Sequence, residues 1–267
     1  MKIVCVGAGS MAEAMINGWI RKRILRPGDI AVMNKSDEDR LDYLTHEYGV
    51  RQVNDEMSML EEAPFILLAV KPKDVKVALS AVREFIRPDA VILSVVAGVS
   101  IDSIQEAAGN IAVARTMPNT SAHVGKSATG VVWSKAVTKE QQYEIRDLLN
   151  SIGSVTVVPE DKLHGVTGIA GSGPAYLYLM AEAMVEAGME SGLEHADAMR
   201  LVRQTFLGAA DMMQHDDFSV LRKRITSPNG TTAAGLNALI ENGFKETVHE
   251  GVRSAVARSK ELGQEYN

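Results

Sequence analysis

The sequence is poor in cysteine, in cationic excess and in long apolar runs. Cys5 is the only cysteine among 267 residues, so no intrachain disulfide can form, and its apolar neighbours indicate a buried, unreactive thiol. The formal net charge of −6 does not favour binding to a polyphosphate, so nucleic acid is not an expected partner. No segment approaches the length of a membrane span, and Met1 leads directly into a strand-like run without an export signal. We therefore expect a cytoplasmic protein with no membrane partner.

Metal-binding spacings are also missing. The histidines form no His-Glu-x-x-His pattern, and a single cysteine cannot form Cys-x-x-Cys, so no metal is expected. Glu182, Glu186 and Glu190 recur every four residues and would share one face of a helix. Such a stripe is more typical of a solvated helix face than of an acid–base cluster.

The first 160 residues alternate short β-branched runs with amphipathic stretches. The runs that predict strands are Ile3–Val6, Ile30–Met33, Phe65–Val70, Val91–Val96 and Ile111–Ala114. Because Phe65–Val70 lacks two-residue alternation, it indicates a strand buried on both faces, as in a parallel sheet covered by helices. Ala128–Trp133, a helix over 138–152 and Val155–Val158 predict a final β-α-β addition. The pattern predicts an α/β domain with a Rossmann-type doubly wound sheet over residues 1–160.

After Pro159 the strand signals stop. Pro174–Leu193 and Ala196–Gln214 are rich in Ala, Met, Leu, Glu and Arg and predict long helices. Ser227–Gly230 interrupts this pattern before a last pair of helices. We therefore expect an all-helical C-terminal domain over residues 161–267, with the boundary near Glu160.

A glycine turn, Gly7–Ala12, follows the first predicted strand and opens a helix. In a G-x-G-x-x-A pattern the first glycine makes the tight turn, the second admits a pyrophosphate, and the small Ala12 allows close helix–strand packing. A Gly-Ala-Gly turn could also merely join a strand to a helix, but the position after the first strand of an alternating pattern favours a dinucleotide site. The residues expected to contact the cofactor here are Gly7, Ala8, Gly9, Ser10 and Met11.

The end of the second predicted strand indicates which dinucleotide binds. NAD sites usually place an acidic residue there, whereas this chain has Asn34, Lys35 and Ser36. Lys35 with Ser36, and Arg40 as a further candidate, would supply a cation and donors for a 2′-phosphate. The alternative is that Lys35 and Arg40 are simply solvated charges. NADPH is the expected cofactor, with NADH as a weaker alternative.

Five segments together resemble the pyrroline-5-carboxylate reductase family over nearly the whole chain. They are Gly7–Ala12, Ala69–Pro72, Arg115–Thr120, Gly171–Tyr176 and Ser227–Gly235. The resemblance implies an oxidoreductase that transfers a hydride from NADPH to the C=N bond of 1-pyrroline-5-carboxylate, giving L-proline in the last step of proline biosynthesis. One position departs from the family, which usually has a second glycine where this chain has Asn229.

The resemblance also implies cofactor contacts after two further strands. It assigns Ala69, Val70, Lys71 and Pro72 to the cofactor, and it places Met117, Pro118 and Asn119 beside the nicotinamide. Lys71 could be a catalytic amine, but a solvated or phosphate-facing charge is more typical at a strand end. Met117-Pro118 could equally be an apolar turn that needs no ligand.

The Ser227–Thr232 segment is the candidate substrate loop. A Pro-Asn-Gly turn runs into a helix, whose first N–H groups suit a carboxylate. The alternative is an ordinary N-cap by Ser227 or Thr231. The resemblance implies substrate contacts from Ser227, Gly230, Thr231 and Thr232. It also implies that the catalytic hydroxyl of Thr232 lies near the ring nitrogen.

Two other functions would use a similar architecture. A hydroxy-acid dehydrogenase needs a Lys in the long helix after the nucleotide domain, and Pro174–Gly192 has none. A non-catalytic NADPH-binding regulator or structural dimer would not need the Ser227–Thr232 loop. The apolar helical half also predicts a homodimer or higher oligomer, with methionines as core and interface residues. These are Met180, Met184, Met189, Met199, Met212 and Met213.

Overall fold

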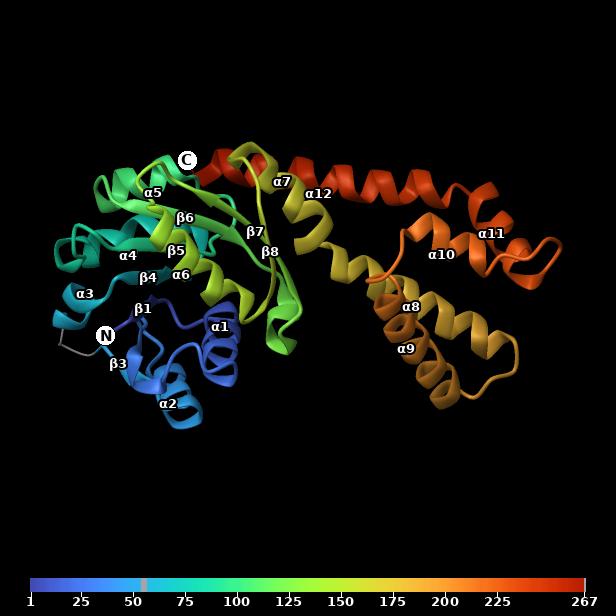
Figure 1. Ribbon diagram of the computed structural model, residues 1–267, viewed down its shortest axis with the longest axis horizontal. Helices are drawn as coiled ribbons and strands as arrows, with labels where there is room; N and C mark the ends of the chain where they lie inside the picture. Colours follow the sequence, from blue (N-terminus) through green and yellow to red (C-terminus); the bar gives the residue numbers. More distant parts are fainter. Residues whose placement is uncertain (54–56, 267) are drawn as a thin grey trace. The chain divides into compact units, whose positions relative to one another are not determined.

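The computed structural model describes residues 1–53 and 57–266 of the chain (Figure 1). The chain divides into two compact units. The first comprises residues 1–172 together with the C-terminal segment from Ala255, and the second comprises residues 173–254. The compact units divide after Ser172 and before Ala255, whereas the sequence predicts a domain boundary near Glu160. That boundary stays a prediction.

The first unit is built on an eight-stranded sheet with the order β3-β2-β1-β4-β5-β6-β7-β8 (Figure 1). The strands are β1 (Ile3–Val6), β2 (Ile30–Met33), β3 (Arg51–Gln52), β4 (Phe65–Leu68), β5 (Val91–Ser94), β6 (Ala112–Met117), β7 (Ser127–Trp133) and β8 (Gly153–Val157). All neighbouring pairs are parallel except β6 and β7. The Rossmann-type sheet that the sequence predicts is thereby confirmed, and β4 is buried along its whole length.

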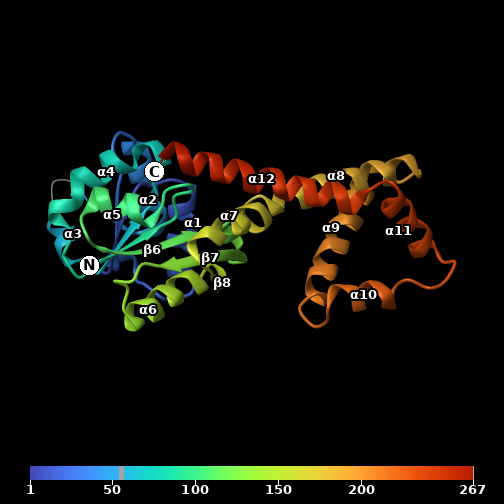
Figure 2. The same ribbon diagram turned by 90° about the horizontal axis from the view of Figure 1, so that it is seen from above.

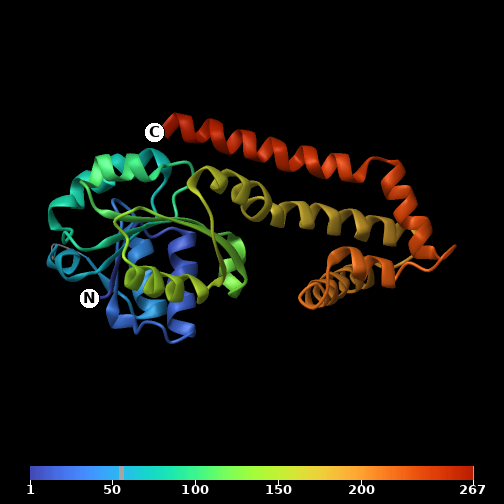
Figure 3. The same ribbon diagram turned by 45° about the horizontal axis from the view of Figure 1, so that its top comes forward.

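Helices cover both faces of this sheet (Figure 3). On one face α1 (Ser10–Arg21), α2 (Glu38–Tyr48) and α6 (Lys139–Asn150) pack around a core that includes Trp19. On the other face lie α3 (Ser58–Glu62), α4 (Val75–Val82), α5 (Ile101–Ala108) and α7 (Leu163–Val166). Strand β1 contributes alternate residues to the two cores, as the two-residue period of a strand requires. Cys5 is fully buried, and burial raises the pKa of its thiol, which explains an inert cysteine.

The last helix, α12 (Phe244–Tyr266), ends in the first unit. Its residues Ser259 and Gly263 are buried. Gly98, after β5, has a φ of +81°, and a Cβ added there would lie 3.4 Å from the Leu262 carbonyl oxygen. The C-terminal end of α12 thus packs against the carboxyl edge of the sheet.

The second unit is entirely helical, as the sequence predicts. It contains α8 (Gly173–Glu190), α9 (His195–Met212), α10 (Phe218–Arg224), α11 (Thr231–Glu241) and the first part of α12 (Figure 2). Its own buried core is small, with Val185, Ala198 and Val202 at its centre. Many large apolar side chains of this unit are exposed, among them Leu177, Leu179, Leu201, Leu207 and Phe218. Within the described part of the chain, none of the helices has the length and apolar character that a membrane crossing needs.

Candidate active site

The glycine turn connects β1 to α1 at the carboxyl edge of the sheet. Gly7 has a φ of +104°, and a Cβ added to it would lie 2.5 Å from the Ala69 carbonyl oxygen, so only glycine fits. Gly9 is the N-cap of α1 and has no side chain to cap it. The first N–H groups of a helix have no intrahelical partner, and the exposed Gly9 and Ser10 leave them open to a phosphate.

The segment after β4 lies directly beside this turn. The Ala69 N–H donates to the Val6 carbonyl at 2.9 Å, which holds the end of β4 next to the end of β1. Ala69 and Val70 are half-buried and Lys71 is exposed, while Pro72 begins a short 3-10 helix. The structure therefore brings together two segments that the sequence assigned to the cofactor, and it leaves the Lys71 amine at the surface.

Of the two candidate cations that follow β2, Lys35 is exposed to solvent, whereas Arg40 of α2 is bonded within the protein. Lys35 and Ser36 are exposed, and Asn34 is half-buried. Arg40 instead forms an ion pair with Glu13 of α1, and its Nε donates to the Ala8 carbonyl oxygen at 2.8 Å. This geometry favours Lys35 over Arg40 as the ligand of a 2′-phosphate.

Glu13 is the centre of a polar cluster that sequence reasoning missed. It accepts hydrogen bonds from Arg40, from the Tyr48 hydroxyl at 3.0 Å and from the Tyr43 hydroxyl at 3.1 Å. Partial burial acts to raise the pKa of Glu13, but the hydrogen bonds from Arg40, Tyr48 and Tyr43 outweigh it and lower the pKa below the ordinary value. The carboxylate is therefore held ionised, and it connects α1 to α2 behind the glycine turn.

The side chain of Asn119, which is expected beside the nicotinamide, is hydrogen-bonded within the protein. It is buried, its Nδ2 donates to the Ala170 carbonyl at 2.9 Å, and its Oδ1 accepts from the Ser121 N–H at 3.1 Å. Met117 is half-buried, and its methyl group is so close to Gly171 that a Cβ there would lie 3.0 Å away. The Arg115–Thr120 segment is thus fixed by contacts with the residues before α8.

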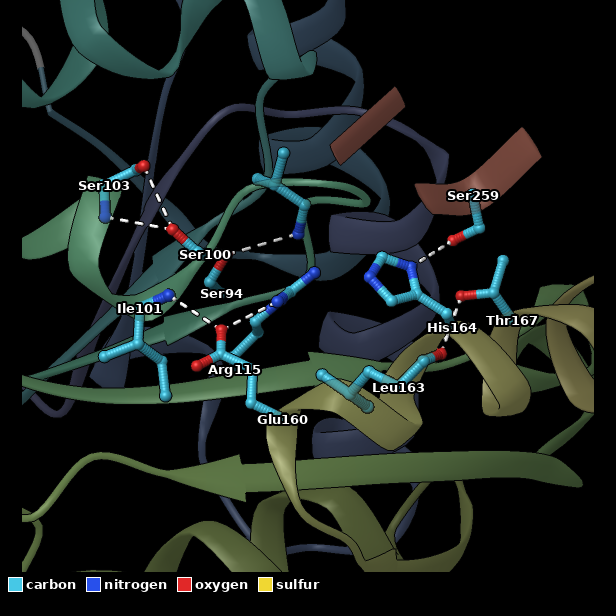
Figure 4. Close-up of polar contacts among 11 residues, drawn as sticks. Ser94, Ser100, Ile101, Ser103, Arg115, Glu160, Leu163, His164, Thr167 and Ser259 are labelled. Carbon is cyan, nitrogen blue, oxygen red and sulfur yellow. Dashed lines mark hydrogen bonds and ion pairs between the residues drawn. The ribbon is translucent and has the colours of Figure 1, made fainter. Parts of the chain in front are cut away.

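A second polar cluster that the sequence did not reveal lies under the end of α12 (Figure 4). The buried Arg115 donates to Glu160 Oε1 at 2.7 Å, and the same oxygen accepts from the Ile101 N–H at 2.9 Å. His164 Nδ1 lies 2.9 Å from the Ser259 hydroxyl. Burial, and then the charges of Arg115 and Lys260, lower the pKa of His164 below 6.5. Glu160 thus connects β6 and the start of α5 to the residues just before α7, and the His164–Ser259 contact connects α7 to α12.

The candidate substrate loop precedes α11 in the second unit. The Gly230 N–H donates to the Ser227 carbonyl at 3.1 Å, and a Cβ added to Gly230 would lie 2.5 Å from the Ser227 hydroxyl oxygen. Asn229 has a φ of +60°, so it adopts the left-handed conformation that a glycine would take there. Gly230 itself is the N-cap of α11 and brings no side chain. No side chain caps α11, so the alternative of an ordinary N-cap by Ser227 or Thr231 does not apply. The first N–H groups of the helix therefore lack an intrahelical partner, and Thr232 beside them is half-buried.

Among the described residues, no group of three or more His, Cys, Asp or Glu side chains could hold a metal ion.

The fold and the glycine turn at its sheet edge define an oxidoreductase of the nicotinamide-dependent class. The family profile described as NADP oxidoreductase coenzyme F420-dependent accordingly matches residues 2–98.

The comparisons with known proteins identify the family within that class. The profile described as pyrroline-5-carboxylate reductase dimerisation matches residues 160–262. Pyrroline-5-carboxylate reductase 2 of Bacillus subtilis is 42% identical over 99% of this chain and 96% of its own length. The enzyme of Staphylococcus epidermidis is 40% identical over 98% of both chains. The chain belongs to the pyrroline-5-carboxylate reductase family.

Solved structures agree with this assignment. A pyrroline-5-carboxylate reductase from Coxiella burnetii matches with a TM-score of 0.91 at 32% identity, covering 98% of both chains. The Plasmodium falciparum pyrroline carboxylate reductase, solved with NADP bound, matches with a TM-score of 0.85 at 27% identity over 98% of both chains. The predicted two-part architecture is thus confirmed over nearly the full length.

Proposed function

We propose that this chain reduces 1-pyrroline-5-carboxylate to L-proline with NADPH, the last step of proline biosynthesis. The observation that carries the proposal is 42% identity to a pyrroline-5-carboxylate reductase over 99% of the chain. The geometry supports it, because Gly7 and Ala69 meet at the carboxyl edge of a Rossmann-type sheet, where such sheets bind dinucleotides. NADPH, when bound, supplies the hydride for the C=N carbon.

The cofactor would be held mainly by backbone groups. We assign the diphosphate to the glycine turn, Gly7–Met11, through the N–H groups after Gly7, because the Gly7 N–H donates to the Met33 carbonyl. We assign the 2′-phosphate to Lys35 with Ser36 and Asn34. Ala69–Pro72 and Met117–Asn119 would border the nicotinamide half. Two observations support this division of roles. Gly9, Ser10 and Lys35 are exposed, whereas Arg40 is bonded to Ala8 and Glu13 within the protein.

The substrate loop would bind the carboxylate and orient the ring. The Thr231 N–H would receive the carboxylate, joined by the Gly230 N–H once it gives up its bond to the Ser227 carbonyl. The Ser227 hydroxyl would lie beside them, and the Thr232 hydroxyl would donate to the ring nitrogen or orient a water toward it. An iminium is already protonated and accepts a hydride readily, so a strong protein acid is not required. Catalysis would then come mainly from positioning and charge complementarity.

The proposal also covers location and assembly. We propose a cytoplasmic homodimer or higher oligomer, formed through the helical unit, whose partners are small molecules rather than nucleic acid. The dimerisation profile over residues 160–262 and the exposed apolar side chains of the second unit support self-association.

The test is a comparison of substrates in the presence of NADPH. We expect the purified chain to oxidise NADPH when 1-pyrroline-5-carboxylate is added and to leave it unchanged with a 2-keto or a 3-keto acid. Activity with a keto acid alone would indicate a hydroxy-acid dehydrogenase. Cofactor binding without oxidation by any of the three would indicate a non-catalytic NADPH-binding protein.

A further inference from the structure

The side chain of Arg40 connects α2 to the glycine turn and to the first turn of α1, which lie 32 and 27 positions earlier in the sequence. It comes from α2, its Nε donates to the Ala8 carbonyl oxygen of the glycine turn at 2.8 Å, and its Nη2 pairs with Glu13 of α1. The side chains of Arg40 and Glu13 are only 25% and 17% exposed, so water screens this pair less than a surface ion pair. The Tyr43 ring lies 5.1 Å from the guanidinium carbon, and Tyr48 donates to Glu13 from the same helix.

The bond to Ala8 fixes the direction of the next N–H group. In a planar trans peptide the carbonyl and the following N–H point in opposite directions. With the Ala8 carbonyl directed at Arg40, the Gly9 N–H must therefore point away from Arg40. Two other contacts hold the same turn, because the Gly7 N–H donates to the Met33 carbonyl at 3.0 Å and Gly7 lies against the Ala69 carbonyl. Arg40 thus sets the orientation of an N–H group that the proposed function assigns to the cofactor diphosphate.

The ion pair has a second effect on the same site. Glu13 lies in the first turn of α1, and a bare carboxylate there would repel a diphosphate bound at the helix N-terminus. Arg40 neutralises that charge from the side of α2. The guanidinium uses Nε for Ala8 and Nη2 for Glu13, so these two nitrogens are directed at the glycine turn and at α1.

We propose that Arg40 is a positioning residue for the cofactor diphosphate, acting through Ala8 and Glu13, and is not the ligand of the 2′-phosphate. The inference rests on the proposed use of a nicotinamide dinucleotide. The diphosphate is common to NADPH and NADH, whereas the 2′-phosphate belongs to NADPH alone. Loss of Arg40 must therefore weaken both cofactors by the same factor.

The test is the affinity of variants for each cofactor, measured by titration without substrate, and the kcat at saturating cofactor. We expect Arg40→Gln to raise the Kd for NADPH and for NADH alike, by about tenfold, with kcat close to that of the wild type. Arg40→Lys keeps the charge but replaces the planar fork, whose Nε and Nη2 bond to Ala8 and Glu13, by a single ammonium, so it should behave similarly. It is the variant to use if Arg40→Gln folds poorly. Arg26→Gln breaks an exposed Arg–Asp pair elsewhere in the unit and should change neither Kd.

Three results would contradict the inference. A loss confined to NADPH, with Arg40→Lys retaining NADPH affinity, would make Arg40 a 2′-phosphate ligand. A lower melting temperature with unchanged Kd for both cofactors would make the pair purely structural. Failure of the wild-type chain to bind either cofactor would instead sink the proposed function, and the inference with it.

Discussion

Thr232 is the residue on which the proposed chemistry depends most. If its hydroxyl aids proton delivery or orients the ring, Thr232→Ala should lower kcat by roughly ten- to a thousandfold while NADPH affinity and fold persist. Thr232→Ser should recover much of the rate. Because an iminium substrate can arrive protonated, the loss should be smaller at low pH than at high pH. Steady-state kinetics across pH check this. A Thr232→Ala enzyme with wild-type kcat and kcat/KM throughout would leave substrate positioning to the loop backbone.

Lys35 should determine the choice between the two cofactors. It is the exposed cation after β2, whereas Arg40 is hydrogen-bonded to Ala8 and Glu13. Replacing it with an acid, Lys35→Asp, should weaken NADPH binding by roughly ten- to a hundredfold and NADH binding much less. Fluorescence titration with each cofactor measures this. Equal losses for both would remove Lys35 from the 2′-phosphate site.

Some residues of the candidate site could be predicted from the sequence because their roles depend on local backbone geometry. Gly7 was expected to make a tight turn, and it has a positive φ. Asn229 stands where the family usually has glycine, and it adopts the left-handed conformation that glycine favours. The Arg40–Glu13 pair could not be found, because its partners are 27 positions apart and meet only when α1 and α2 pack on the same face of the sheet. The same holds for Arg115 with Glu160, whose contact depends on how the chain returns to β6 after β8.

At the scale of the elements, hydrophobic pattern and composition predicted the longer strands to within a few residues, and likewise the three helices whose bounds were given, α6, α8 and α9. The strand predicted over Phe65–Val70 ends at Leu68 because the chain turns there toward the glycine turn. The two-residue β3 was missed, since so short a segment has no period. The antiparallel pairing of β6 with β7 and the return of α12 to the first unit were not predicted either, because both depend on tertiary packing.

The packing of α12 on α7 should make stability depend on pH. The pKa of His164 is lowered, first by burial and then by Arg115 and Lys260, whereas Glu160 and Asp161 act in the opposite direction. The unfolded chain therefore binds the proton more readily, so the stability associated with neutral His164 is present above about pH 6.5 and is lost as pH falls through the lower folded pKa. Urea unfolding of the wild type and of His164→Gln checks this. The wild type should lose more stability than the variant between about pH 7 and 5; a difference that stays constant with pH would contradict the prediction.

At the scale of the whole molecule, the second unit should be stable only as part of an oligomer. Its buried core is small, and side chains such as Leu177, Leu207 and Phe218 are more than half exposed in the single chain. Large apolar side chains exposed in such number are typical of a protein–protein interface. We expect sedimentation at micromolar concentration to give a dimer or a multiple of it. The introduced charge in Leu207→Glu should dissociate the assembly.

A matched control comes from the first unit. Tyr143 of α6 is 68% exposed, so Tyr143→Glu places the same charge on an apolar surface residue outside the helical unit and should leave the assembly intact. A stable, active wild-type monomer at micromolar concentration would contradict the prediction, as would dissociation by Tyr143→Glu alone.

The central claim, that this chain transfers a hydride from NADPH to a C=N bond, is tested most directly by isotope transfer. NADPH carrying deuterium at the transferable position of the nicotinamide would be incubated with the chain and 1-pyrroline-5-carboxylate, and the product analysed by mass spectrometry and NMR. The account predicts L-proline with a single deuterium on the carbon that formed the C=N bond. Unlabelled proline, or no proline while NADPH binds normally, would contradict it.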